Sequence, residues 1–153
     1  AAGGGMALAL AGDIVIAARS AYFLQAFRRI GLAPDVGSTW LLPRRIGVAR
    51  AMELSLLGEK LPAERALAWG LINRVVDDGA ALDEAMKLAR EMAAGPTRAL
   101  GLMRGLYWDS TENNFEDQLD LEYRTQREAG ASEDFKEGVA AFLEKRATKF
   151  KGK

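Results

Sequence analysis

The spacing of apolar residues changes near residue 80 of this chain. Before that point, short apolar runs typical of strands alternate with segments whose apolar residues recur at helical spacing. After it, only helical spacing is found. Alternating strands and helices favour a layered α/β architecture. The pattern therefore predicts an α/β region over residues 1–79 and an all-helical region over residues 80–153.

The first region contains one segment that is apolar on every side. It covers residues 6–11 and follows a glycine run. A helix without a polar face must be buried, so we expect this one inside the core. A short helix is expected from about Val36 to Leu42, with Pro43 at its end because proline interrupts helical hydrogen bonding. The other elements are two helices and three strands, predicted over residues 47–57, 61–69, 13–18, 22–25 and 71–76.

The second region is predicted as a series of helices joined by turns. Ser132 opens the last of them as an N-cap, and acids follow in its first turn, where the helix dipole favours negative charge. Residues 145–153 then carry five basic residues and no acid. The earlier helices are expected over residues 82–92, 97–108 and 113–128.

Composition narrows the classes of partner and of chemistry. The chain has 153 residues, of which 49% are apolar, and this is enough for a folded core. Basic and acidic residues each total 21, so no charge imbalance points to nucleic acid or a membrane surface. No apolar run reaches the roughly 18 residues of a membrane span. The chain lacks cysteine and histidine. Acid–base chemistry therefore falls to carboxylates, lysine, tyrosine or water, and we expect a cytoplasmic protein without a metal site.

Asp35 is the most unusual polar residue of the first region. It is the only acid between Asp13 and Glu53. Pro34 disfavours helix at the preceding residue, so the chain turns here and Asp35 comes to lie near a helix start. Asp35 can act as a cap or turn residue, or as a catalytic acid, and the Pro-Asp dipeptide alone favours the first interpretation. Six arginines share the same interval, namely Arg19, Arg28, Arg29, Arg44, Arg45 and Arg50.

The glycine run is a second candidate for chemistry. Gly3, Gly4 and Gly5 stand at a helix start, where backbone N–H groups have no partner within the helix. Such groups can bind an oxyanion, since no side chain blocks the approach of a ligand. The same glycines can equally serve close packing of backbones. Both interpretations remain open from the triplet alone.

Several short motifs follow one another in a fixed order along the whole chain. They are Ala1–Gly5, Ala11–Ala17, Gly31–Gly37, Leu57–Glu59, Ala68–Ile72 and Glu137–Arg146. In this order and spacing the chain resembles the enoyl-CoA hydratase/isomerase, or crotonase, superfamily. The turn around Asp35 looks most like that of the ring-epoxide and enoyl-CoA isomerases of phenylacetate degradation.

The resemblance implies a fold and a set of site residues. The fold is the crotonase (ClpP-like) spiral, an α/β core followed by a helical trimerisation region. The family's second oxyanion donor falls on the N–H of Gly4, and the acid of its isomerases falls on Asp35. Hydratases of the family carry two glutamates, whose positions hold Ala7 and Phe27 here, and neither residue can exchange a proton. The substrate-binding residues implied by the resemblance are Gly3, Phe27, Leu32, Trp40, Lys145 and Lys149.

The sequence is therefore interpreted as the C-terminal portion of an acyl-CoA isomerase. The CoA thioester is the substrate, and no separate cofactor is expected. The family's first oxyanion donor comes from a preceding half, which this chain is expected to need, and the helices after Ala80 are expected to assemble a trimer or a dimer of trimers. The alternatives are an enoyl-CoA hydratase, a non-catalytic assembly or binding module, and a CoA-dependent dehalogenase. A dehalogenase would use the acid at this turn as a nucleophile, but the family then expects an indole where Phe27 stands.

Overall fold

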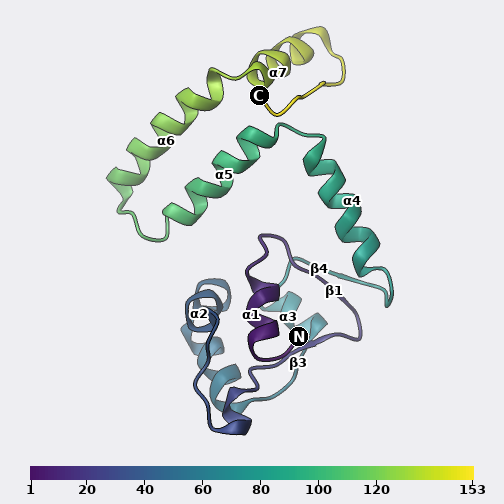
Figure 1. Ribbon diagram of the computed structural model, residues 1–153, viewed down its shortest axis with the longest axis vertical. Helices are drawn as coiled ribbons and strands as arrows, with labels where there is room; N and C mark the ends of the chain where they lie inside the picture. The colour runs from purple at the N-terminus through teal and green to yellow at the C-terminus, as the bar shows by residue number, and fades with distance from the viewer. The chain divides into compact units, whose positions relative to one another are not determined.

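The computed structural model describes all of residues 1–153 (Figure 1). By its internal packing the chain divides into two compact units, Ala1–Ala85 and Met86–Lys153. The division lies within one helix, α4 (Ala81–Ala93), a few residues after the change in the sequence pattern. None of the helices combines the length and the apolar composition needed to cross a bilayer.

The first unit alternates helices with very short strands. Its strands form two small sheets, in which β1 runs parallel to β4 and β2 runs antiparallel to β3. In the first pair Ile16 lies opposite Arg74, and in the second Phe23 lies opposite Leu61. The elements in order are α1 (Gly4–Leu10), β1 (Ile16–Ala18), β2 (Tyr22–Phe23), the 3₁₀ helix η1 (Phe27–Ile30), α2 (Ser38–Leu57), β3 (Leu61–Pro62), α3 (Ala63–Ala68) and β4 (Arg74–Val76).

The strands β1 and β2 are shorter than the apolar runs that contain them, because the residues next to them make hydrogen bonds outside the sheets. Before β1, the N–H of Val15 donates to the side-chain Oδ1 of Asn73 over 2.8 Å and not to a backbone carbonyl, and the strand begins at Ile16. After β2, Leu24 pairs with the chain start instead: its N–H donates to the carbonyl of Ala1 at 3.0 Å. The N–H of Gly3 returns a bond to the Leu24 carbonyl at 2.9 Å. This pairing places the glycine run beside β2.

Helix α1 is buried on one side only. Met6, Ala7 and Leu10 are buried, and the helix packs against α2. Leu8, however, is 69% exposed, so the expectation of burial on every side was wrong. A helix of seven residues makes only two turns, and the rest of this unit covers one face of them.

Helix α2 does not end at Pro43, as the sequence had predicted. Proline lies inside it, and the break comes instead at Gly47, whose φ of 78° and ψ of 159° lie outside the helical region. The helical turns before and after Pro43 bury Leu42 and Ile46. This packing keeps the helix continuous through the proline, although one hydrogen bond is lost there. The second half ends at Gly58, in the left-handed conformation expected of a C-terminal glycine.

The core of the first unit is formed by apolar side chains from its helices and strands. Residues from α1, α2 and α3 meet the inward-facing residues of the strands. This packing fixes the ends of α1 and α2, where the candidate site lies. The buried cluster consists of Met6, Leu10, Val15, Ala17, Phe23, Leu42, Ile46, Ala51, Leu54, Leu61, Ala63, Ala66, Leu71 and Ile72.

The second unit continues from α4 with helices alone. In Figure 1, α5 (Thr97–Asp109) and α6 (Phe115–Gly130) lie side by side, and α7 (Glu133–Glu144) packs against α6. The predicted N-cap is confirmed, because the hydroxyl of Ser132 accepts a bond from the N–H of Phe135 at 3.0 Å. No residue of α5 or α6 is buried.

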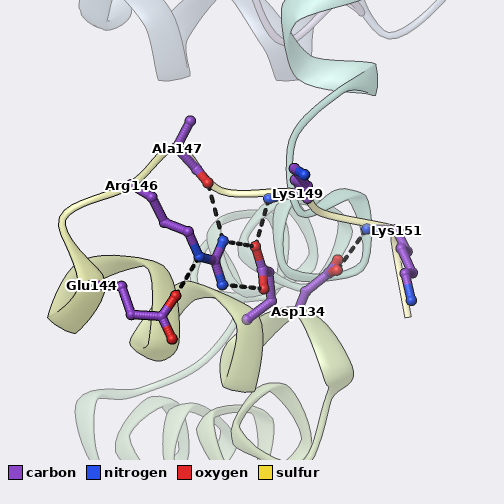
Figure 2. A network of polar contacts seen from close by, with 7 residues as sticks. Asp134, Glu144, Arg146, Ala147, Lys149 and Lys151 are labelled. Carbon is purple, nitrogen blue, oxygen red and sulfur yellow. Dashed lines mark hydrogen bonds and ion pairs between the residues drawn. The ribbon is translucent and has the colours of Figure 1, made fainter.

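The C-terminal tail folds back onto α7 through two acidic residues (Figure 2). Asp134, which is 4% exposed, accepts backbone N–H bonds from Lys151 at 2.7 Å and Gly152 at 2.8 Å. Glu137 accepts two bonds from the guanidinium of Arg146, at 2.6 and 3.0 Å, and one from the N–H of Lys149 at 2.8 Å. The basic tail is therefore ordered by carboxylates of its own helix.

We expect the attachment of the tail to depend on pH through Glu137. The hydrogen bonds from Arg146, and then the one from the N–H of Lys149, lower the pKa of Glu137 from 4.5 to about 2. A lowered pKa in the folded state means that the contribution of Glu137 is complete above pH 4.5. It declines as the pH falls below that value and is lost near pH 2. The chemical shift of the Lys149 amide, followed by NMR over this range, measures the effect.

Glu137→Gln is the matched control for this pH dependence. Glutamine keeps a carbonyl oxygen for the N–H of Lys149 but carries no charge for Arg146. The acid transition of the Lys149 amide should disappear in the variant. An unchanged transition would show that another group controls the tail.

Candidate active site

The turn around Asp35 is built from consecutive left-handed residues. Gly31, with φ of 71°, ends η1, and the chain then runs without regular structure to Val36 and Gly37, whose φ values are 50° and 76°. Helix α2 begins directly afterwards at Ser38. The backbone carbonyl of Asp35 accepts bonds from the N–H and the hydroxyl of Ser38, at 2.9 and 2.7 Å. The turn is therefore fixed by the backbone of Asp35 and leaves its side chain free.

The carboxylate of Asp35 does not cap the helix that follows. The N-cap of α2 is Gly37, and no side chain donates to or accepts from this helix end. The structure contains no ion pair or hydrogen bond to the Asp35 carboxylate, and the residue is exposed. The capping interpretation is thus wrong for the side chain, and the catalytic interpretation stays a prediction.

In the glycine run Gly3–Gly5, one backbone N–H group has no hydrogen-bond partner. The N–H of Gly3 donates to the carbonyl of Leu24 at 2.9 Å, and that of Gly5 donates to the carbonyl of Ala2 at 3.0 Å. The N–H of Gly4, which opens α1, has no hydrogen-bond partner in the structure. Gly3 has φ of 52° and ψ of −128°, a conformation that side chains rarely adopt. The run therefore presents a single free donor held between two bonded neighbours.

The free donor and the free carboxylate belong to adjacent residues in space. A Cβ placed on Gly4 would lie 3.7 Å from Oδ1 of Asp35 and 3.4 Å from Cγ2 of Val36. A Cβ placed on Gly3 would lie 3.7 Å from the ring of Phe27, which is 8% exposed. The packing of α1 against α2 thus brings together Gly4 and Asp35, which are far apart in the sequence.

The other predicted site residues are placed less closely. Leu32 lies in the same turn and is 61% exposed. Trp40, in the first turn of α2, has the Arg44 guanidinium 3.9 Å from its ring centroid. Lys145 and Lys149 belong to the second unit, where both are exposed and Lys145 ends α7 with φ of 53°. Their predicted roles toward a substrate stay predictions.

No second acid replaces the missing glutamates. Ala7 and Phe27 occupy the two positions, and both are buried apolar residues. No cluster of three or more acids, histidines or cysteines in the chain could hold a metal ion. Among the residues of this chain at the glycine run and the turn, Asp35 is the one with a side chain that can exchange a proton.

Two features of the site were missed in the sequence. The left-handed backbone of Val36 has no signal beyond its place between an acid and a glycine. Arg28 and Arg29, which the sequence showed only as members of the arginine group near Asp35, donate to the carbonyls of Leu57 at 2.6 Å and Gly58 at 2.9 Å. They thereby cap the C-terminus of α2.

Comparison with known proteins decides the family. The family model for enoyl-CoA hydratase/isomerase matches residues 1–153. The chain belongs to the enoyl-CoA hydratase/isomerase family. This membership confirms the family resemblance of the sequence motifs.

Curated relatives and solved structures of the family agree with this assignment. The 1,2-epoxyphenylacetyl-CoA isomerase of Escherichia coli (strain K12) is 56% identical over 153 residues, which are 100% of this chain and 58% of that protein. A crystal structure of a Mycobacterium abscessus protein assigned to the same family has a TM-score of 0.98 at 40% identity, covering 99% of this chain and 58% of that one. The enoyl-CoA hydratase of Mycobacterium tuberculosis H37Rv has a TM-score of 0.95 at 36% identity, covering 100% of this chain and 61% of that one. The predicted crotonase fold is confirmed, and the chain spans about three fifths of the length of these relatives.

Proposed function

We propose that this chain contributes the acid and one oxyanion donor to the active site of an acyl-CoA isomerase. The observation that carries the proposal is the unpaired carboxylate of Asp35 beside Gly4, whose N–H is the free donor of the glycine run. An acid next to a hydrogen-bond donor is the minimum required to move a proton through an enolate.

The proposed reaction needs one proton-carrying group. Asp35 removes a proton from the α-carbon of a β,γ-enoyl thioester, and the electron pair moves to the thioester oxygen. The N–H of Gly4 stabilises that oxyanion. The dienolate then takes a proton from Asp35 at the γ-carbon, which gives the α,β-enoyl thioester. The CoA thioester is the substrate, and a second oxyanion donor would come from residues outside this chain.

The position of Asp35 and the absence of a second acid favour isomerisation over hydration. Adding water to a double bond requires acid and base work at oxygen and carbon, and Ala7 and Phe27 stand where hydratases carry glutamates. The 56% identity to a ring-epoxide isomerase supports the same class of reaction. The ring-epoxide of an aryl-acetyl-CoA is therefore the second candidate substrate.

A chimera tests the proposed function in an enzyme of complete length. Residues 1–153 replace the matching residues of the Escherichia coli relative, and the purified chimera is incubated with a β,γ-enoyl-CoA in deuterated water. We expect migration of the double bond and exchange of the α- and γ-protons, without a hydrated product. Predominant formation of 3-hydroxyacyl-CoA would instead favour a hydratase. A covalent ester on Asp35, detected by mass spectrometry after incubation with a halogenated aryl-CoA, would favour a dehalogenase.

We also propose that the second unit serves assembly into a homo-oligomer. Large apolar side chains remain exposed along its helices, and α5 and α6 bury none of their residues. Apolar surface of this extent is typical of a protein contact. The most exposed of these side chains are Tyr107, Phe115, Phe142 and Leu143.

A further inference from the structure

Val36 has a backbone conformation that valine rarely adopts. Its φ of 50° lies in the left-handed region, where a β-branched side chain crowds its own backbone. The only other non-glycine residue with positive φ is Lys145, at the end of α7. A strained residue of this kind persists where surrounding contacts hold it, and such residues gather at functional sites.

The turn itself does not require valine at this position. Gly37, the next residue, also has a positive φ, of 76°, and glycine or asparagine at position 36 would allow the turn with less strain. Burial does not explain the valine either, because its side chain is 53% exposed. The reason for valine lies in what its side chain contacts.

The side chain of Val36 lies against the glycine that carries the free N–H. Its Cγ2 is 3.4 Å from the point where a Cβ of Gly4 would stand, so the methyl group occupies the space beside that glycine. Oδ1 of Asp35 lies 3.7 Å from the same point. Because Val36 directly follows Asp35, its contact with Gly4 fixes the peptide from which the carboxylate extends.

We propose that Val36 is a positioning residue that holds the Asp35 carboxylate beside Gly4. Its left-handed backbone turns the γ-methyl toward α1, and the methyl sets the separation between acid and donor. The importance of this separation for catalysis rests on the proposed function. The positioning of Asp35 by Val36 can be measured without turnover. The positioning role and the proposed function can therefore be refuted separately.

A mutant cycle read by NMR on the ¹⁵N-labelled full chain tests the positioning. Replacing Asp35 by asparagine removes a charge beside Gly4 and should shift the Gly4 amide resonance. In the Val36→Gly background we expect the same replacement to lose most of this shift. The midpoint of thermal unfolding should stay the same or rise by about 2–4 °C, because glycine relieves the strain. The Gly5 amide, already bonded to Ala2, is the internal control.

Val36→Thr provides the conservative variant, since threonine keeps the branched shape that contacts Gly4. It should retain the full Asp35-dependent shift. In the chimera, Val36→Gly should lower kcat about tenfold or more without lowering stability, because small misplacements of a catalytic group are costly. A full shift in Val36→Gly would overturn the proposal, and so would a lost shift accompanied by a lower unfolding midpoint. An intact shift pattern in a chimera without isomerase activity would refute the proposed function and leave the positioning role standing.

Discussion

Asp35→Asn in the chimera should lower isomerase turnover by about 10²–10⁴-fold, the range that a single general acid–base contributes. Asparagine has nearly the same shape as aspartate, but it cannot take up and return a proton. The exchange of α- and γ-protons in deuterated water should fall with turnover, because both depend on the same group. Measuring exchange and turnover together links the loss to proton transfer and not to product release.

The stability of the Asp35→Asn variant separates catalysis from architecture. The carboxylate makes no hydrogen bond or ion pair, and the carbonyl that holds Ser38 is retained. The free energy of unfolding should therefore change by no more than about 0.5 kcal/mol. Asp83→Asn is the matched control, because Asp83 is an exposed acid in the first turn of α4. Exchange at the parent rate in Asp35→Asn would end the catalytic hypothesis for this residue.

Gly4→Pro should lower kcat by about 10²–10³-fold, the usual effect of removing one oxyanion donor. Proline deletes the single free N–H of the glycine run. Gly4 is the first residue of α1, a position at which proline is tolerated in helices, so the fold should be retained. Steady-state kinetics of the chimera, with circular dichroism to check the fold, measure the two effects.

Two alanine variants complete the test of Gly4. Gly5→Ala should be nearly neutral, because a Cβ there meets nothing within 4 Å and the N–H of Gly5 remains bonded to Ala2. Gly4→Ala retains the N–H but places a methyl group between Val36 and Asp35, so it should reduce activity through the lost space. Turnover of Gly4→Pro within about tenfold of the parent, a loss of only ~1.4 kcal/mol, would show that Gly4 serves packing alone.

The elements that follow from local chemistry were predictable from the sequence. The N-cap at Ser132 and the C-terminal glycine at Gly58 depend on residues within one turn, and both are confirmed. The position of the break in α2 was not predictable, because burial of Leu42 and Ile46 outweighs the bond lost at Pro43. Strand ends were also missed, since the Asn73 side chain that accepts from the N–H of Val15 before β1 comes from a distant part of the chain.

The candidate site shows the same division between local and distant information. The turn at Asp35 was predicted from Pro34 and its neighbours, whereas the closeness of Asp35 and Gly4 depends on helix packing that no local pattern records. Only the resemblance to the family, through the order of its motifs, indicated that Gly4 and Asp35 belong to one site. The conformation of Val36 was hidden for the same physical reason, because its φ is imposed by contacts and opposes the preference of valine.

The break at Gly47 affects how sequence variation in this family should be interpreted. A side chain at position 47 would touch nothing within 4 Å, yet φ of 78° with ψ of 159° belongs to a region open essentially to glycine alone. Intolerance to substitution at this position would thus reflect the direction in which the chain must leave the first half of α2, not contact with a ligand. An invariant residue at a surface position without neighbours can reflect a backbone conformation that only glycine adopts. Gly47 should therefore be excluded when invariant residues are used to outline the substrate site.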